Sequence, residues 1–78
     1  MSVQAYILVQ TGVGRAADVA EKIRTLSGVT LAEDVTGPYD VIVRAEANSV
    51  DELGALVVAN VQNVDGITRT VTCPVVHI

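Results

Sequence analysis

A chain of 78 residues with a net charge of −4 has room for one small domain, and it carries no basic run that would hold the phosphates of DNA or RNA. Half of its residues are hydrophobic, but it contains no Trp, no Phe and only two Tyr, so we expect a core of Val, Ile, Leu and Ala. The single cysteine, Cys73, excludes an internal disulfide and a cysteine-rich metal site. No apolar run approaches the roughly 18 residues of a membrane span and the first ten residues lack a signal-peptide pattern, so a cytoplasmic protein is expected.

The hydrophobic content is high for so small a domain. At this length a single core supplies about 3–5 kcal/mol of stability, and many such domains gain the remainder by associating. Because no membrane span takes up the apolar residues, more apolar surface remains than one monomer can hide. We therefore expect a homo-oligomer, whose subunits cover this surface for one another.

The amino-terminal third of the chain predicts a strand followed by a helix. From Val3 to Gln10, apolar and more polar residues alternate with the period of two that is typical of a strand. A glycine-rich break follows, and Arg15 to Leu26 then shows helical spacing, with Asp18 and Lys22 placed as a favourable i, i+4 pair. The apolar stripe of this helix, which is expected to face the core, consists of Ala16, Val19, Ala20, Ile23 and Leu26.

Two strands joined by a tight turn form the middle of the chain. Gly28 is expected to end the helix. Val29 to Val35 then alternates as a strand and runs into Gly37-Pro38, a pair that stops strands because proline cannot donate to a ladder. The next strand, Asp40 to Ala47, contains the most apolar run of the chain. The residues expected to share one face are Val29, Leu31, Glu33 and Val35 in the first of these strands, and Val41, Val43, Ala45 and Ala47 in the second.

A second helix and a last strand complete the pattern. Ser49 and Glu52 have the spacing of a capping box, in which each side chain accepts a hydrogen bond from the other residue's backbone N–H. A strand begins at Ile67, after Asp65-Gly66, and Pro74 indicates that this strand lies at a sheet edge or bends there. The helix is expected to bury Val50, Leu53, Leu56, Val57 and Val61, and the strand is expected to carry Thr68, Thr70 and Thr72 on one face.

The order strand, helix, strand, strand, helix, strand defines the fold class. It is the βαββαβ plan of the ferredoxin-like fold, an α+β architecture in which two helices cover one face of a four-stranded antiparallel sheet. With right-handed crossovers the third strand lies between the first and the second, which gives the spatial order 4-1-3-2. Strand parity directs Tyr6, Leu8 and Ile42 to the helix-free face. We expect two such faces to pack together as a dimer, with these three residues at the interface.

A glycine pattern after the first strand invites a different interpretation. Gly12-x-Gly14-x-x-Ala17 opens a helix, and Glu33 follows about twenty residues later, as in the dinucleotide-binding fingerprint. That site requires adjacent parallel strands, and the Gly37-Pro38 turn is too short for a parallel crossover. We therefore interpret the glycines as a sharp turn from strand to helix.

No catalytic or metal-binding constellation is evident, and no cofactor is expected. Cys73 and His77 share a face of an extended chain but stand about 13 Å apart at about 3.3 Å per residue, too far to act as nucleophile and base. We expect Cys73 to be a small buried thiol and His77 to be a surface side chain. Glu33 and Asp34 are adjacent and therefore point to opposite faces of their strand, so they cannot act as a pair.

The turn between the two middle strands carries the best candidate for a binding site. One interpretation of Tyr39 and Asp40 is a tyrosine that covers the sheet edge and an aspartate that binds local backbone donors. The other is a small site for a zwitterion, in which Asp40 holds an amine, backbone N–H groups near Gly37 hold a carboxylate and Tyr39 forms a wall. The polar face of the last strand carries Thr68, Thr70 and Thr72. These residues either only favour a strand because they are β-branched, or they supply polar contacts across a subunit boundary.

Three stretches of the chain form a combination that is typical of one family. Val35-Thr36-Gly37-Pro38-Tyr39-Asp40 is similar to a strand–Gly-x-Tyr-Asp–strand signature. Asp51-Glu52-Leu53 matches the helix that follows, and the stretch from Val64 to Thr72 looks like the final strand. With these residues the chain resembles the effector-binding (RAM) domain of the Lrp/AsnC transcription regulators. The resemblance makes residues 1–78 a single such domain.

The resemblance implies how the domain assembles and binds. Members pair sheet to sheet as dimers, the dimers assemble further, and an amino acid or related molecule binds between dimers near the Gly-x-Tyr-Asp turn. Carried over, this implicates Gly37, Tyr39 and Asp40 as ligand-binding residues, together with the strand face of Thr68, Thr70 and Thr72. The helix-turn-helix of full-length members is absent from the chain, so we expect no direct contact with nucleic acid, and none with a membrane.

The expected function is therefore effector sensing at subunit interfaces, in regulation and not in catalysis. One alternative is a structural modulator that co-assembles with full-length Lrp/AsnC regulators. The other is a small enzyme of the dimeric α/β-barrel type, which would require His, Asn or Trp around an internal cavity. The chain has one His and no Trp, which argues against the enzyme.

Overall fold

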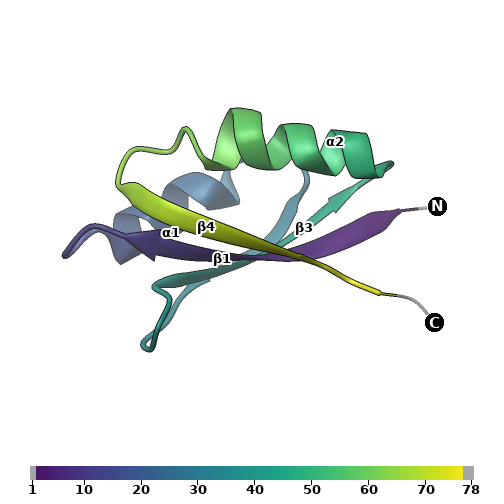
Figure 1. Ribbon diagram of the computed structural model, residues 1–78. Helices are drawn as coiled ribbons and strands as arrows, with labels where there is room; N and C mark the ends of the chain where they lie inside the picture. Colours follow the sequence, from purple (N-terminus) through teal and green to yellow (C-terminus); the bar gives the residue numbers. More distant parts are fainter. Residues whose placement is uncertain (1, 77–78) are drawn as a thin grey trace.

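The computed structural model describes residues 2–76, which form a four-stranded antiparallel sheet with the helices on one side (Figure 1). In space the strands follow the order β2-β3-β1-β4, which confirms the predicted order. None of the described helices is long and apolar enough to cross a membrane. In chain order the elements are β1 (Val3–Thr11), α1 (Ala16–Arg24), β2 (Val29–Asp34), β3 (Val41–Ala47), α2 (Val50–Ala55), the π-helical segment η1 (Leu56–Val61) and β4 (Ile67–Pro74).

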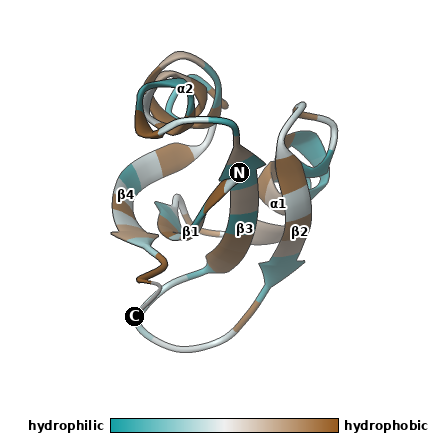
Figure 2. Ribbon diagram, turned by 90° about the vertical axis from the view of Figure 1, so that its right-hand side faces the viewer, coloured by the Kyte–Doolittle hydropathy of each residue, from teal (hydrophilic) through white to brown (hydrophobic). Residues whose placement is uncertain are grey.

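The core lies between the helices and one face of the sheet. The two central strands, β1 and β3, bury alternate residues completely, as the period of two predicts, and Figure 2 shows hydrophobic residues along β3. No aromatic ring belongs to the buried core of the described residues, so the expectation of small aliphatic side chains is confirmed. The buried residues are Ala5, Ile7, Val9, Val19, Ala20, Ile23, Ala32, Val41, Val43, Ala45, Leu53, Leu56, Val57 and Val61.

The first helix begins and ends close to the predicted positions. Gly14, with φ of +75°, turns the chain from β1 into α1, which agrees with the interpretation of the glycines as a turn. The predicted pair is present, with 3.3 Å between Asp18 Oδ2 and Lys22 Nζ. The helix ends at Arg24, however, with Thr25 as its C-cap, so the prediction that Gly28 ends it is wrong. Gly28 instead shapes the turn that leads into β2, where its φ is +92°.

Strand β2 contains an irregularity that the sequence pattern did not reveal. Between Val29 and Leu31 its pairing with β3 shifts, so that one additional residue stands on β2. As a result Ala32 is buried and Leu31 is 40% exposed on the helix-free side, opposite Arg44. Because a one-residue shift reverses the faces of a strand, the prediction of a single face is wrong for the set Val29, Leu31, Glu33 and Val35.

The second helix begins with the predicted cap, in a modified form. Ser49 Oγ accepts a hydrogen bond from the N–H of Glu52 at 3.1 Å. Glu52 Oε2 accepts from the N–H of Asn48, also at 3.1 Å, and not from that of Ser49. Val50 is 71% exposed, so the prediction that it belongs to the buried stripe is wrong. Helical spacing alone placed it on the buried face, but the first turn of a helix lies at the margin of the contact.

The helix-free face of the sheet carries the residues that parity assigned to it. Tyr6 pairs with Arg44 and Leu8 pairs with Ile42, and all four alternate with buried neighbours. Tyr6 is 38% exposed, while Leu8 and Ile42 are half-buried. The described chain therefore presents these side chains on one open surface, and their place in a dimer interface stays a prediction.

The last strand lies at one edge of the sheet, as Pro74 indicated, because β4 pairs with β1 alone. Cys73 stands opposite Tyr6 and is exposed, so the prediction of a buried thiol is wrong. Residues of an edge strand have a neighbour on one side only, which leaves this thiol uncovered. His77 lies outside the described residues.

Candidate functional site

The turn between β2 and β3 is tied to the central strand β1. The backbone N–H of Asp40 donates to the carbonyl oxygen of Val9 at 2.9 Å, and the carbonyl oxygen of Asp40 accepts the N–H of Val35 at 2.8 Å. The side-chain Nε2 of Gln10 donates to the carbonyl oxygen of Pro38 at 3.1 Å. These bonds anchor an exposed turn to the best-paired strand of the sheet.

The side chain of Asp40 extends this attachment. Its Oδ2 accepts the backbone N–H of Thr11 at 2.8 Å, where β1 ends. The aspartate thus binds a backbone donor, as in the first of the two interpretations, but this donor is 29 positions away on β1 and is not a local one. Its Oδ1 makes no hydrogen bond to the described residues. One carboxylate oxygen is therefore engaged in holding the turn, and the other is available for further contacts.

The other residues of the signature differ in their surroundings. Gly37 has φ of +138° and open space where a Cβ would stand, so glycine is required here for its backbone angle and not for lack of room. Tyr39 is half-buried and makes no side-chain hydrogen bond to the described residues. The turn therefore offers exposed backbone at Gly37, a partly covered aromatic ring and one carboxylate oxygen within four residues.

Two of the three threonines of β4 lie on the helix side of the sheet, and the third lies at an irregularity of the strand. Thr70 and Thr72 pair with Val9 and Ile7, whose side chains point to the helices, and Thr70 Oγ1 accepts a hydrogen bond from Gln62 Nε2 at 3.1 Å. Thr68 lies at a shift in the pairing with β1. A shallow hollow of about 320 Å³ beside the strand is lined by Gln62, Ile67, Thr68, Arg69 and Thr70.

Only part of the predicted site comes together at one end of the sheet. Thr11 binds Asp40 and also pairs with Ile67 at the start of β4, so the turn and Thr68 lie at the same end, on either side of β1. Thr72 pairs with Ile7, four residues farther along β1, which corresponds to about 13 Å at about 3.3 Å per residue. The structure therefore does not place Thr72 beside the turn.

An ion pair that the sequence did not reveal lies at the same end of the sheet as the turn. Arg15 Nη2 lies 3.1 Å from Asp65 Oδ2 and 3.5 Å from Asp18 Oδ2. The hydrogen bond and the charge of Arg15 lower the pKa of the Asp65 carboxyl below its ordinary value of 3.8, and Asp65 in turn raises the pKa of Arg15. Fifty positions separate Arg15 and Asp65, so no local pattern could have signalled the pair.

The lowered pKa of Asp65 predicts a small effect of acid on stability. A carboxyl whose pKa is depressed in the folded state stabilises the fold above its ordinary value of 3.8, and this contribution is lost as the pH falls through the folded-state pKa. In Asp65→Asn we expect the urea midpoint to fall less steeply below that pH than in the wild type. Both partners are exposed to water, so the difference will be modest.

The matched control for this measurement is Glu21→Gln, an exposed position of α1 without a side-chain partner among the described residues. Its midpoint should follow the wild-type curve. If Asp65→Asn also followed the wild-type curve, the ion pair would contribute nothing to the acid response.

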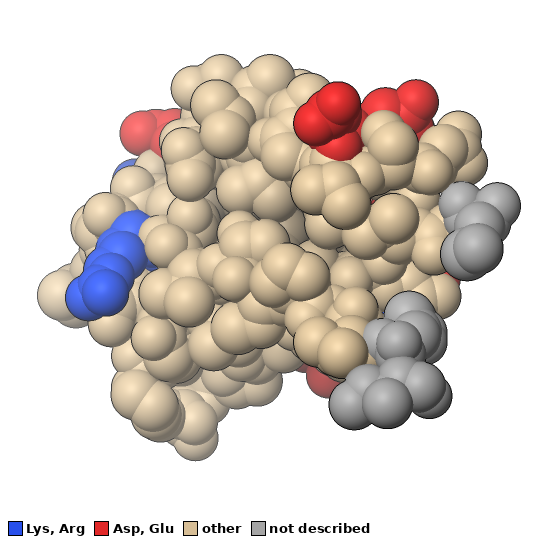
Figure 3. All heavy atoms as spheres, turned by 45° about the vertical axis from the view of Figure 1, so that its right-hand side comes forward, with Lys and Arg blue, Asp and Glu red and all other residues tan. Residues whose placement is uncertain are grey.

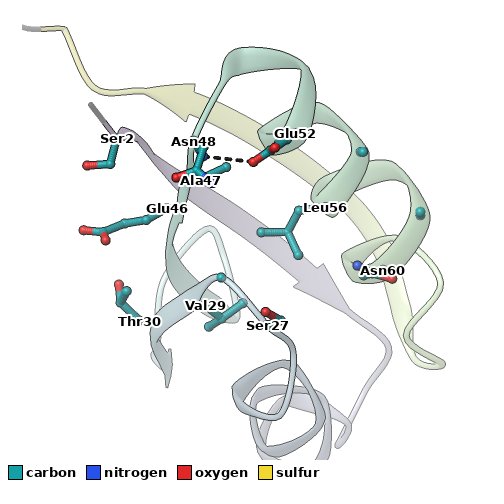
Figure 4. A pocket seen from close by; sticks show the side chains of 13 residues that line it. Ser2, Ser27, Val29, Thr30, Glu46, Ala47, Asn48, Glu52, Leu56 and Asn60 are labelled. Carbon is teal, nitrogen blue, oxygen red and sulfur yellow. Dashed lines mark hydrogen bonds between the residues drawn. The ribbon is translucent and has the colours of Figure 1, made fainter.

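A hollow of about 700 Å³ lies at the other end of the sheet, away from the turn. The end of β3, the start of β2 and the side of α2 and η1 surround it, and in Figure 4 Val29 and Leu56 point toward its middle. Glu46 and Glu52 lie at its margin. None of Gly37, Tyr39 and Asp40 belongs to it. This hollow and the signature turn are therefore separate features of the surface.

A polar network on the helix-free face was also missed, although strand parity could have revealed it. Arg44 donates to the hydroxyl oxygen of Tyr6 and to Oε1 of Gln4, and Gln4 Nε2 donates to Glu46 Oε1 at 3.1 Å. All four residues share the parity of the open face. Considered together as one cross-strand set, they would have indicated a charged group at the centre of the expected interface.

Charged residues make up only 18% of the chain. Most of the face in Figure 3 is neither acidic nor basic, with acidic side chains along its upper margin. Among residues 2–76 no group of three His, Cys, Asp or Glu side chains is arranged to hold a metal ion.

Comparison with known proteins identifies the family. The pattern of the Lrp/AsnC ligand binding domain matches residues 4–78. The uncharacterized HTH-type transcriptional regulator PF0250 of Pyrococcus furiosus is 31% identical over 55 residues, which make up 70% of this chain and 37% of that protein. The chain thus spans little more than a third of the length of this curated relative.

Solved structures share the fold over nearly the whole chain. TTHA0845 from Thermus thermophilus is 28% identical, with a TM-score of 0.90 over 97% of this chain and 95% of that one. AsnC of E. coli is 25% identical, with a TM-score of 0.89 over 97% of this chain and 52% of that one. The family is regulatory and non-enzymatic. The resemblance seen in the sequence is therefore confirmed, and the chain belongs to the Lrp/AsnC family, as one of its ligand-binding (RAM) domains.

Proposed function

We propose that this domain senses an amino acid or a closely related zwitterion at a boundary between its subunits. Ligand-binding domains of the family oligomerise and bind amino-acid effectors. In this chain we assign the binding residues to the turn of Gly37, Tyr39 and Asp40. The observation that supports this assignment is the anchoring of an exposed turn to β1 by three hydrogen bonds, from Thr11, Gln10 and Asp40.

The chemistry of the turn suits the two charged ends of an amino acid. Asp40 Oδ2 is engaged with Thr11, and Oδ1 is directed to no described partner, so it can accept an ammonium group. Gly37 has no side chain, and a carboxylate can therefore approach the backbone N–H groups beside it. The half-buried ring of Tyr39 supplies an apolar wall for the ligand's side chain.

A second subunit is needed to enclose such a ligand. Binding sites for small molecules cover about 70–90% of the ligand surface, whereas neither the 700 Å³ hollow nor the 320 Å³ hollow of the single chain includes the turn. We therefore propose that two chains form a dimer through the open face of Tyr6, Leu8 and Ile42, and that such dimers associate further around the turn. Thr68, at the same end of the sheet, is the nearest of the predicted threonines.

The substitution Asp40→Asn tests the assignment most sharply. The amide oxygen of asparagine can still accept the N–H of Thr11, so the turn stays anchored while the negative charge is removed. A hydrogen bond to a charged group contributes about 1.5–3 kcal/mol. We therefore expect amino-acid affinity to fall about ten- to a hundredfold, with little change in the melting temperature of the unliganded protein. Native mass spectrometry and thermal shift with a panel of amino acids measure both.

The control for this experiment is Asp51→Asn, in the first turn of α2 and at the opposite end of the sheet. It should bind as the wild type does. Wild-type affinity in Asp40→Asn would contradict the assigned site. A wild-type protein that forms dimers and binds none of the amino acids would contradict the sensing function itself.

A further inference from the structure

Arg44 places a positive charge in the middle of the helix-free face. It stands opposite Tyr6 on β1 and opposite Leu31 on β2, and it is half-buried. The next row of the same face consists, in strand order, of Glu33, Ile42, Leu8 and Val71. The guanidinium therefore lies among side chains that two packed sheets would cover.

Among residues 2–76 this guanidinium has neutral partners only. It donates to the Tyr6 hydroxyl and, at 2.8 Å, to Gln4 Oε1, and its carbon lies 5.1 Å from the centroid of the Tyr6 ring. It forms no ion pair with a carboxylate of residues 2–76. The side chain of Gln4 stands between Arg44 and Glu46 and binds both. The open face thus holds Arg44 in place without neutralising it.

Covering such a charge requires a carboxylate from the other side of the interface. An arginine removed from water without an opposite charge is strongly destabilising, whereas a paired one is tolerated. The strands of the helix-free face carry Arg44 and Arg69 as bases, and Glu33 and Glu46 as acids. Because positive and negative groups balance on this one surface, a second copy of the same surface is the partner whose charges fit it.

We propose that in the dimer Arg44 of each subunit forms an ion pair with Glu33 of the other. The inference rests on the proposed dimer through the open face. Glu46 is engaged with Gln4, whereas Glu33 makes no side-chain hydrogen bond or ion pair with residues 2–76. Glu33 is also exposed, so its carboxylate is accessible to a facing sheet.

The strand register permits this pairing. Leu31 stands opposite Arg44, and Glu33 stands opposite Ile42 in the adjoining row. In a face-to-face dimer, a twofold axis can run perpendicular to the strands and midway between these two rows. It places Glu33 of one copy over Leu31 of the other. Leu31 is one strand spacing, about 4.8 Å, from Arg44 of the same copy. Packed sheets lie about 10 Å apart, a gap that an arginine and a glutamate span from opposite sides.

A charge exchange between two variants tests the pair. Alone, Arg44→Glu brings Glu33 against a second carboxylate, and Glu33→Arg brings Arg44 against a second guanidinium. We expect each variant alone to dimerise about a hundredfold more weakly than the wild type, since both symmetry-related pairs become repulsive. Mixed together, the two chains should form a heterodimer of near wild-type affinity, because both pairs are then attractive. Native mass spectrometry resolves the species by mass.

The matched control replaces Glu33→Arg by Glu46→Arg in the mixture with Arg44→Glu, and it should not restore the dimer. Restoration by Glu46→Arg and not by Glu33→Arg would overturn the assignment, as would Arg44→Glu dimers of wild-type affinity. Glu33 lies outside the Tyr6 and Gln4 contacts, so Glu33→Arg gives a readout even if Arg44→Glu fails to fold. A monomeric wild type would instead refute the dimer of the proposed function.

Discussion

Replacing Ile42 by aspartate is expected to weaken the dimer by more than a hundredfold and to leave mostly monomer at micromolar concentration. Ile42 lies opposite Leu8 at the centre of the helix-free face. In the proposed dimer the facing Arg44 is engaged by Glu33, so a carboxylate at position 42 would be buried without a free counter-charge, and the twofold symmetry would bring two of them into one interface. Breaking a desolvated contact in this way costs about 3 kcal/mol or more. Sedimentation velocity over a concentration series measures the dissociation constant.

Val58→Asp is the control for this experiment. Val58 is also an apolar residue of the surface, 62% exposed, but it belongs to η1 on the helix side of the sheet. We expect it to leave the dimer unchanged. If Val58→Asp dissociated the dimer and Ile42→Asp did not, the subunits would associate through the helices and the assignment of the open face would be wrong.

Replacing Gly28 by alanine is expected to lower the free energy of unfolding by about 2–4 kcal/mol, a large share of what so small a domain possesses. Its φ of +92° is strained for any residue with a Cβ. A Cβ would also stand 2.9 Å from the carbonyl oxygen of Glu46 and 3.1 Å from Leu56 Cδ2. The nearer obstacle is backbone, and the N–H of Glu46 already binds the Gly28 carbonyl at 2.7 Å. Urea denaturation at a fixed protein concentration gives the difference.

Gly54→Ala is the matched substitution with the opposite expected sign. Gly54 lies within α2, and a Cβ there would meet no atom within 4 Å. Since alanine favours a helix over glycine by about 1 kcal/mol, the variant should be more stable than the wild type. A Gly28→Ala variant as stable as Gly54→Ala would show that the turn into β2 relaxes without cost.

The candidate site combines features that follow from neighbouring residues with others that depend on residues far apart in the sequence. The exposed turn, its glycine angle and the adjacency of Tyr39 and Asp40 are readable from a few consecutive residues. The engagement of Asp40 with Thr11 joins residues 29 positions apart, and it decides that one carboxylate oxygen is structural. The exposure of Cys73 likewise depends on β4 being an edge strand.

The sequence by itself determined the element order, the strand order and the buried faces of the central strands. Periodicity, glycine and proline positions and the handedness of crossovers are local or generic rules, and they suffice for this much. Tertiary structure decided which way Leu31 faces, where Arg15 finds Asp65, and how Arg44 is held by Gln4 and Tyr6. A one-residue shift in pairing reverses a strand face, and contacts between distant residues depend on that register. No pattern along the chain contains this information, because the register is fixed only when the strands meet.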